Sequence, residues 1–298
     1  RRYTAKIGSL PGVQVLFQRA ADIPSKVDEG SADLGMVGLD RFTESHRENG
    51  NANVIMEDLG FASADLVLAV PDTWIDVSSV ADLADLAVEF RQSGRELRIA
   101  TKYIGLVEQF LYRHGIYYFS IVESSGTLEA APAMGFADII ADISETGVTL
   151  RENRLKLLSD GRVFSSQACL IGNTNTLAAQ NGRLDLARSI LERIEAKLRA
   201  SGYYLITANI QGSDSDVVAR EILKKPEFAG MRGPTIARTF SSDSNDWYAV
   251  TIVISRDRLQ ASVDHLRNIG GSNLTVTQPS YIFQDNCDSY ERLVSMLS

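Results

Sequence analysis

The residues best suited to chemistry lie in the segment 123–153, where two turns of small and hydroxyl-bearing residues each precede an expected helix. The turns read SSGT and ETGVT, and between them an apolar strand at 139–141 ends at Asp142. Backbone N–H groups of such turns, threonine hydroxyls and the positive end of a helix dipole all favour a phosphate group. The carboxylates of Glu129, Asp142 and Glu145 suit Mg²⁺, ribose hydroxyls or positive charge developing on a sugar. The segment therefore predicts a site for a phosphorylated sugar.

Composition excludes several classes of protein. The chain has 298 residues, 44% of them apolar, which is enough for about two domains with buried cores. No apolar run approaches the ~20 residues that span a bilayer, and a net charge of −8 argues against general nucleic-acid or membrane-surface binding. The two cysteines and three histidines show no zinc or disulfide-scaffold spacing. We therefore expect no nucleic-acid or membrane partner. No signal peptide is visible, which favours a cytoplasmic protein, or a plastid one in a plant or alga.

Strand and helix patterns alternate through the first two thirds of the chain, which predicts α/β layers with mainly parallel sheets. The patterns form two sets, which indicates two lobes around a cleft at the carboxyl ends of their strands. We expect the first lobe to comprise residues 1–97 and 165–200, and the second to comprise residues 98–164. A polar segment, 151–162, precedes the apolar strand that resumes at 165. Helices are expected around 80–92, at 105–114 with Gly115 as the stop signal, and, as an amphipathic pattern, at roughly 182–200.

The last part of the chain, residues 203–298, has a different pattern. Its strands and helices follow the order βαββαβ, which is typical of a ferredoxin-like module. The expected strands are 203–212, 234–241, 247–255 and 273–279, and the expected helices are 214–225 and the segment that ends at Ile269.

Together these motifs resemble the ATP phosphoribosyltransferase family, in its long, hexameric form with a C-terminal regulatory domain. In the two lobes the resemblance runs through DLGMVGLD (33–40), LGFASADLVLAVP (59–71), RIATKY (98–103), SGTLEAAPAMGFAD (125–138), DISETGVTLREN (142–153) and SSQACL (165–170). In the tail it runs through GMRGPTI (230–236) and LRNIGGSNLTV (266–276). Relative to the family, the first strand and its basic turn are expected to be missing, and the frequent Pro-Asn pair after RIATxY is Ile104-Gly105.

The resemblance implies a fold and a reaction. The fold is a two-lobed, periplasmic-binding-protein-like catalytic region followed by a ferredoxin-like domain that senses histidine. The reaction condenses ATP with phosphoribosyl pyrophosphate to N1-(5-phosphoribosyl)-ATP and pyrophosphate, with Mg²⁺, as the first step of histidine biosynthesis. Feedback inhibition by histidine and a homo-oligomer are also implied, either a hexamer or a hexamer in equilibrium with a dimer.

The resemblance also implies roles for particular residues. Glu129 and Asp142 are the expected catalytic residues, and Asp142 is the expected contact to substrate-bound Mg²⁺. The residues expected to bind substrates are Glu145, Thr146, Gly147, Val148 and Thr149 at the 5′-phosphate, Gly38 and Asp40 at the second substrate, and Lys102 and Tyr103 at phosphate or base. The residues expected to bind histidine are Met231, Gly233, Thr235 and Gly271. Positioning is expected to matter more than general-base chemistry.

Structural explanations stay open for most of these residues. Glu129 could be a helix-dipole partner, Asp142 an N-cap, and Asp40 a cap of the helix that follows it. The remaining alternatives are a tight turn for Gly147, a helix start for Thr149 and a solvated side chain for Lys102.

Two other functions stay open as well. Paired α/β lobes around a cleft also describe solute receptors, so the chain could be a bilobal protein that binds a small ligand. The ETGVT turn, its nearby acids and the sensor-like tail weigh against that function. The chain could also be a non-catalytic or regulatory family member, which would bind phosphoribosyl pyrophosphate without turnover.

Overall fold

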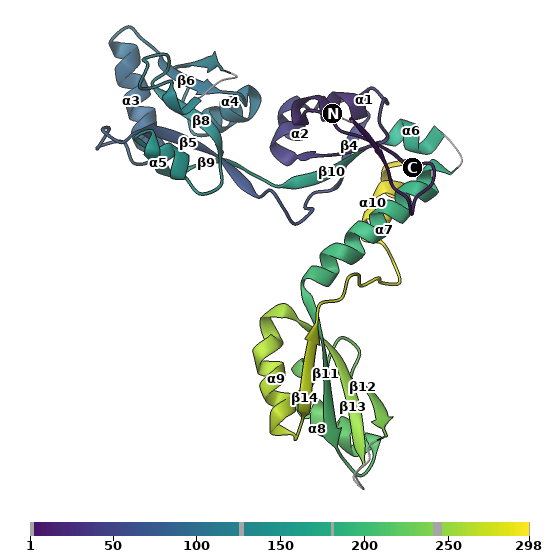
Figure 1. The fold of residues 1–298 in the computed structure, drawn as a ribbon. Coiled ribbons are helices and arrows are strands. Elements are labelled where there is room, and N and C mark those ends of the chain that lie inside the picture. Colours follow the sequence, from purple (N-terminus) through teal and green to yellow (C-terminus); the bar gives the residue numbers. More distant parts are fainter. Residues whose placement is uncertain (1–2, 125–127, 180–181, 241–245, 298) are drawn as a thin grey trace. The chain divides into compact units, whose positions relative to one another are not determined.

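A computed structural model describes residues 3–124, 128–179, 182–240 and 246–297 (Figure 1). The chain divides into two compact units, one formed by Arg1–Ala187 with Arg292–Ser298 and the other by Arg188–Glu291. The first unit holds two separate main sheets, one for each predicted lobe, and a small antiparallel hairpin of β1 (Thr4–Lys6) and β2 (Gln14–Leu16).

The first lobe is built on a three-stranded sheet. Its order is β3-β10-β4, formed by Leu34–Gly38, Ala168–Asn173 and Ala52–Met56. The central strand β10 runs antiparallel to both neighbours. The helices α1 (Ile23–Asp28) and α2 (Leu39–Ser45) contribute Val27 and Phe42 to a core shared with buried residues of this sheet. After β10 the chain continues into α6 (Thr174–Ala179).

The second lobe is built on a five-stranded sheet with the order β7-β6-β8-β5-β9. In chain order its strands are β5 (Ala64–Pro71), β6 (Leu97–Thr101), β7 (Phe119–Glu123), β8 (Ile139–Ser144) and β9 (Leu155–Ser166). One face shares a core with α3 (Val80–Gln92) and α4 (Ile104–Arg113). The other shares a core with α5 (Val148–Glu152) and the short η2 (Leu128–Ala130). Helices and loops therefore cover both faces, which explains the apolar strands seen in the sequence.

Local sequence signals set one end of α3 and one end of α4, the helices on either side of β6 in the chain. Helix α3 begins at a capping box, in which the Ser79 side chain accepts from the N–H of Asp82 and the Asp82 carboxylate accepts in return. Helix α4 ends at Arg113 and is followed by Gly115, whose φ of +73° suits glycine, and the N–H of Ile116 closes the last turn by donating to Leu111 O at 3.0 Å. Both helices thus begin or end where the sequence pattern placed them.

Two predictions about the two lobes are wrong. The second lobe begins at β5, with Ala64, and not at residue 98, because β5 pairs with β8 and β9. The sheets are not mainly parallel: the first-lobe sheet is antiparallel, and in the second lobe the β6–β7 and β6–β8 pairs alone are parallel among the described residues. The polar segment 151–162 contains much of β9, which is a strand at the sheet edge and can therefore carry exposed polar side chains.

The second unit contains the predicted ferredoxin-like module. Its elements are β11 (Tyr203–Gln211), α8 (Ser215–Leu223), β12 (Thr235–Thr239), β13 (Trp247–Ser255), α9 (Leu259–Asn268) and β14 (Ser272–Thr277). The antiparallel sheet has the order β12-β13-β11-β14, so the βαββαβ prediction is confirmed. Helices α8 and α9 share a core with one face of this sheet, through Val218, Ile222 and Leu266 (Figure 1).

Two helices run across the limits of the second unit, Arg188–Glu291. Helix α7 (Arg183–Ser201) was expected from its amphipathic pattern, whereas α10 (Asp288–Leu297) was not. Because Arg292–Ser298 belong to the first unit, the predicted domain 203–298 is too long at its carboxyl end.

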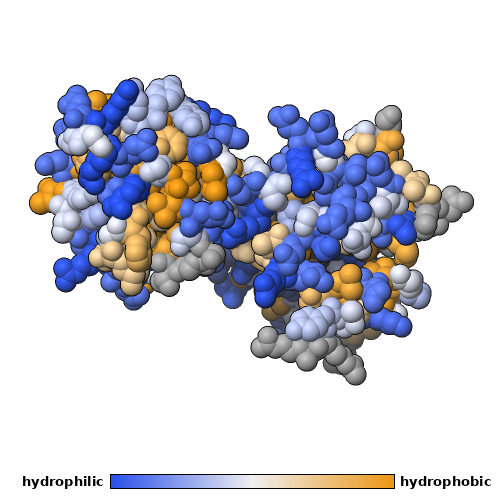
Figure 2. All heavy atoms as spheres, turned by 90° about the horizontal axis from the view of Figure 1, so that it is seen from above, coloured by the Kyte–Doolittle hydropathy of each residue, from blue (hydrophilic) through white to orange (hydrophobic). Residues whose placement is uncertain are grey.

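Polar side chains cover most of the face shown in Figure 2, with smaller apolar groups between them. Among the described residues, no helix combines the length and the apolar composition needed to cross a bilayer.

Candidate active site

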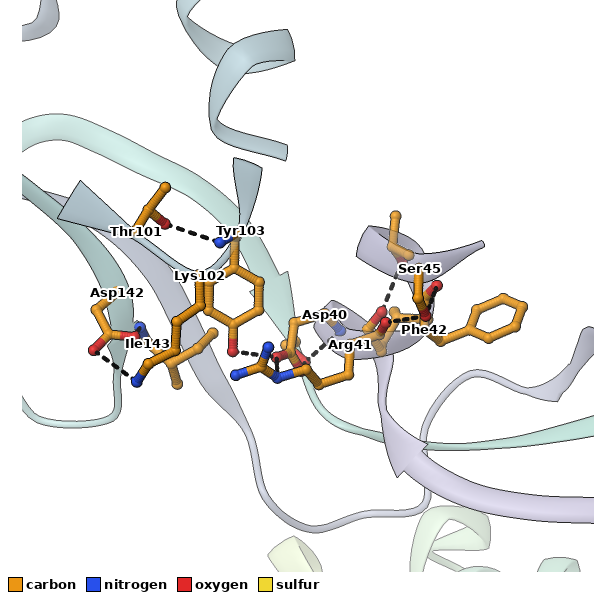
Figure 3. Close-up of polar contacts among 12 residues, drawn as sticks. Asp40, Arg41, Phe42, Ser45, Thr101, Lys102, Tyr103, Asp142 and Ile143 are labelled. Atoms are coloured by element: carbon orange, nitrogen blue, oxygen red, sulfur yellow. Dashed lines mark hydrogen bonds and ion pairs between the residues drawn. The ribbon is translucent and has the colours of Figure 1, made fainter. Parts of the chain in front are cut away.

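The candidate site lies at the carboxyl ends of parallel strands in the second lobe. Strand β6 pairs with β7 and β8, and Thr101 at its end lies opposite Glu123 and Ala141. The next residues on the two inner strands, Lys102 and Asp142, are therefore neighbours. The Lys102 Nζ atom lies 4.0 Å from Asp142 Oδ2 (Figure 3). With 30% of its side chain exposed, Lys102 is only partly solvated, and it faces a carboxylate.

Asp142 lies inside β8, in an environment that disfavours its charge. Burial raises the pKa of Asp142, and the nearby charge of Glu129 raises it further, while the N–H of Ile143 and the cations Lys102 and Arg41 oppose the rise. The alternative role as an N-cap is wrong, because the residue that N-caps α5 is Gly147. A metal ion or a positively charged sugar carbon at this carboxylate would offset the cost of its ionisation.

Glu129 lies close enough to Asp142 to affect its ionisation. It belongs to the single 3₁₀ turn η2, so no long helix offers it a macrodipole. Most of the SSGT turn, residues 125–127, lies outside the described residues. The structure thus brings together two of the predicted acids, one from strand β8 and one from the 3₁₀ turn η2.

The ETGVT turn joins β8 to α5. The N–H of Gly147 donates to Ser144 Oγ at 2.9 Å, and Gly147 has a φ of +70°. An added Cβ would meet nothing closer than Arg151 Nη1, at 3.3 Å. The left-handed backbone and not the lack of space therefore requires glycine here, so Gly147 does form a tight turn, and its contact with a phosphate stays a prediction.

The other residues of this turn are accessible to a ligand. Glu145, Thr146, Val148 and Thr149 are all exposed. Val148 and Thr149 open α5, where the first N–H groups have no acceptor within the helix. Thr149 does start the helix, as its structural alternative proposed, and that position leaves its N–H and hydroxyl available.

On the first lobe, Asp40 is buried and fully engaged. It is 8% exposed, and its Oδ1 accepts from Ser166 Oγ at 2.6 Å. Its Oδ2 accepts from the Tyr103 hydroxyl at 2.7 Å (Figure 3). The predicted cap of α2 is wrong, because the side chain bonds across to β9 and to the β6–α4 turn. At position 38, a Cβ would collide with the Asp40 carboxylate, so Gly38 makes room for that side chain.

Arg41 is a site residue that sequence reasoning missed. Its guanidinium lies over the Tyr103 ring, 4.5 Å from the centroid, and its Nε lies 3.9 Å from Asp40 Oδ2. Burial and the hydrogen bond to Asp40 raise the pKa of Tyr103, which keeps its hydroxyl protonated and donating. In the sequence, Arg41 looks like any solvated residue in a first helical turn. Only the fold places this second cation near Asp142.

No group of three or more His, Cys, Asp or Glu side chains that could hold a metal ion occurs in the part of the chain described by the structure. Asp142 and Glu129 nevertheless fit Mg²⁺, which protein sites often bind through one or two carboxylates together with substrate phosphates.

The residues expected to bind histidine lie at two edges of the ferredoxin-like sheet. Met231 and Gly233 are exposed in the loop before β12, which Thr235 begins, whereas Gly271 precedes β14. Because β12 and β14 are the two edge strands, one module does not bring these two groups together. Gly271 also has a structural role, since its N–H caps α9 by donating to Leu266 O at 2.8 Å.

The comparisons with protein families and with named relatives agree with each other. The family model described as ATP phosphoribosyltransferase matches residues 19–196, and the model described as HisG, C-terminal domain, matches residues 200–279. The chain is 37% identical over 303 residues to ATP phosphoribosyltransferase 1, chloroplastic, of Arabidopsis thaliana, covering 100% of this chain and 73% of that protein. It is 35% identical over 298 residues to the ATP phosphoribosyltransferase of Nitrobacter hamburgensis, covering 100% of this chain and 88% of the other.

Among solved structures, the chain is similar to one in the ATP phosphoribosyl transferase (HisG:HisZ) complex from Thermotoga maritima. The identity is 25% and the TM-score 0.48, over 61% of this chain and 79% of that one.

Proposed function

This chain belongs to the ATP phosphoribosyltransferase family, and from that premise we propose which of its residues carry out the reaction. It is a phosphoribosyltransferase of the first step of histidine biosynthesis. Neither a solute receptor nor a non-catalytic member is favoured. The roles given below to individual residues are proposals.

The 5′-phosphate of phosphoribosyl pyrophosphate binds the ETGVT turn. This assignment is supported by the turn that the left-handed Gly147 forms and by the exposure of Thr146 and Thr149, residues whose backbone N–H groups and hydroxyls can bind an anion. Arg151 adds positive charge here, because its Nη2 donates to Thr146 O at 3.4 Å. The exposed side chain of Glu145 would then face the ribose and not the phosphate, since two anions repel.

Asp142 and Glu129 bind the ribose and stabilise positive charge at C1′. In the reaction the adenine N1 of ATP attacks C1′ as pyrophosphate leaves, so charge accumulates on the sugar in the transition state. The carboxylate of Asp142 is suited to this role, because its burial leaves its own charge poorly solvated. The same two residues would hold Mg²⁺, which supplies charge neutralisation to the departing pyrophosphate when bound.

Arg41 and Lys102 are the cations proposed to contact the phosphates of ATP or the leaving pyrophosphate. They lie on opposite lobes, and both lie close enough to Asp142 to lower its pKa. Gly38 and Asp40 were expected to contact the second substrate directly. Because the Asp40 carboxylate is already hydrogen-bonded within the protein, we propose that it acts by holding Tyr103, and that ATP meets the Tyr103 and Arg41 side chains.

Histidine binding and assembly follow from the second unit. The two predicted histidine-binding segments lie on opposite edges of one sheet, so we propose that histidine binds between modules of different copies in a homo-oligomer such as a hexamer. Bound histidine would favour a less active assembly. A plastid location is proposed in the case of a plant or alga, because relatives at 37% identity are named chloroplastic; a cytoplasmic location is proposed otherwise.

The single observation that carries this proposal is the Lys102–Asp142 pair beside the exposed ETGVT turn, at neighbouring strand ends. It is tested by measuring pyrophosphate release from ATP, phosphoribosyl pyrophosphate and Mg²⁺, with and without histidine. Asp142→Asn should abolish release, and Arg162→Gln, an exposed charge on β9, serves as the control. Wild-type release that survives Asp142→Asn would refute the assignment of Asp142.

A further inference from the structure

Helix α2 of the first lobe reaches the second lobe with two carboxylates. Asp40 and Glu44 are four residues apart, so they lie on the same face of this helix. Glu44 Oε1 accepts from the N–H of Gly105 at 2.8 Å, and its Oε2 accepts from the N–H of Leu106 at 3.0 Å. Asp40 accepts from the Tyr103 hydroxyl of the same segment. Helix α2 thus accepts hydrogen bonds from one side chain and two backbone amides of the segment that joins β6 to α4.

By accepting from these two amides, Glu44 supplies the side-chain cap that the local sequence of α4 lacks. Helix α4 has Tyr103 at its N-cap, which makes no side-chain capping bond, and its first turn contains no acidic residue. Gly105 and Leu106 are the second and third residues of the helix, whose N–H groups an N-cap side chain normally satisfies. Glu44 takes that place from another lobe, and its charge also suits the positive end of the α4 dipole.

We propose that Glu44 is a positioning residue for the transferase reaction. The hydrogen bonds that Asp40 and Glu44 accept from the Tyr103–Leu106 segment form a latch between the lobes, and this latch fixes the separation of the two lobes at the site. The latched segment directly follows Lys102, and Arg41 lies between the two latch carboxylates on α2. Holding the latch closed therefore keeps Arg41 and Lys102 at a fixed spacing around Asp142. This inference rests on the proposed roles of those cations.

The chain offers a matched control at Gly105. A Cβ at this position would lie 3.5 Å from Glu44 Oε1, which is an ordinary contact, so Gly105→Ala fits without breaking the latch. Alanine in place of glycine stabilises a helix. The double variant Glu44→Gln with Gly105→Ala therefore restores helix stability without restoring the charged link between the lobes.

We expect Glu44→Gln to lower kcat/KM for ATP about tenfold, since it loses hydrogen bonds to a charged acceptor. Its Kd for phosphoribosyl pyrophosphate should stay within about twofold of the wild-type value, because the proposed phosphate site lies within the second lobe. In the double variant the melting temperature should recover while kcat/KM stays low. Recovery of kcat/KM together with the melting temperature would show that Glu44 only stabilises α4, and it would overturn the proposal.

The distance between the two lobes can be measured without relying on catalysis. Cysteines introduced at the exposed positions Glu48 and Gln92 would carry spin labels, whereas the native Cys169 and Cys287 are buried. The distance distribution between the labels should broaden in Glu44→Gln, with or without Gly105→Ala. An unchanged distribution would overturn the latch, even in a protein whose pyrophosphate release had failed. A broadened distribution in an inactive protein would support the latch and count against the proposed function.

Discussion

Replacing Tyr103 with phenylalanine should lower the free energy of unfolding of the first unit by about 2 kcal/mol. The hydroxyl donates to Asp40 Oδ2 at 2.7 Å, and both residues are buried, at 3% and 8% exposure. A hydrogen bond to a charged group contributes about 1.5–3 kcal/mol. We take the middle of that range because Asp40 keeps the 2.6 Å bond from Ser166, so its carboxylate is not left without a partner.

The assay is urea unfolding of the wild type and the variant, followed by a double-mutant cycle with Asp40→Asn. In the Asp40→Asn background the loss of the hydroxyl should cost about 1 kcal/mol less, because the charge that strengthened the bond is gone. Tyr112→Phe, at a ring that is 49% exposed, is the control and should change stability by less than about 0.5 kcal/mol. If Tyr103→Phe unfolded at the wild-type urea concentration, the Asp40–Tyr103 bond would contribute nothing to stability, and Asp40 could not be holding the Tyr103–Leu106 segment in the latch.

Other substitutions test the site and the tail. Asp142→Asn should be inactive, yet at pH 8 it should be no less stable than the wild type. Because the pKa of Asp142 is raised in the folded state, the stability of the wild type falls as the pH rises through that pKa. The difference in melting temperature between the variant and the wild type should therefore shrink toward pH 4. Thr149→Ala should weaken binding of phosphoribosyl pyrophosphate by about 1–2 kcal/mol in calorimetry, and an unchanged Kd would return the hydroxyl to a structural role. Gly147→Val should lower that affinity further, because a β-branched residue cannot hold a φ of +70° without strain; a wild-type Kd would contradict this. Gly271→Ala should lower the melting temperature of the second unit, since its Cβ would lie 2.5 Å from Leu266 O; unchanged melting would show that the α9 cap is adaptable.

The sequence predicted the elements with strong periodicity and clear end signals. Helix α3 falls on the predicted residues 80–92, because Ser79 and Asp82 form a capping box. Strand β13 falls on 247–255, where buried and half-buried residues alternate without interruption. By contrast, β9 carries Asp160 and Arg162 on exposed positions and has register shifts in its pairing with β5, so its pattern read as polar.

Only the part of the site whose residues are neighbours in the sequence could be predicted. The ETGVT turn and Asp142 are neighbours in sequence, so their types and spacing indicated a phosphorylated sugar. Arg41 and Glu44 gave no signal, because each looks like an exposed residue of a short helix until the fold sets α2 against the β6–α4 turn. Asp40 was predicted to contact the second substrate, whereas in the structure its carboxylate accepts hydrogen bonds from the buried Tyr103 and Ser166 hydroxyls.

The central position of β10 has a consequence for synthesis of the chain on the ribosome. Strands β3 and β4 each pair with β10, which is made long after them, so the first lobe cannot assemble its sheet until residues 168–173 have emerged. The second lobe is one continuous stretch from Ala64 to Ser166 and can fold while the first lobe waits. During that interval the apolar edges of β3 and β4 are open to wrong partners. Slowing translation just before residue 168 should therefore expose a nascent chain to aggregation or chaperone capture, whereas the excised segment 64–166 should fold by itself.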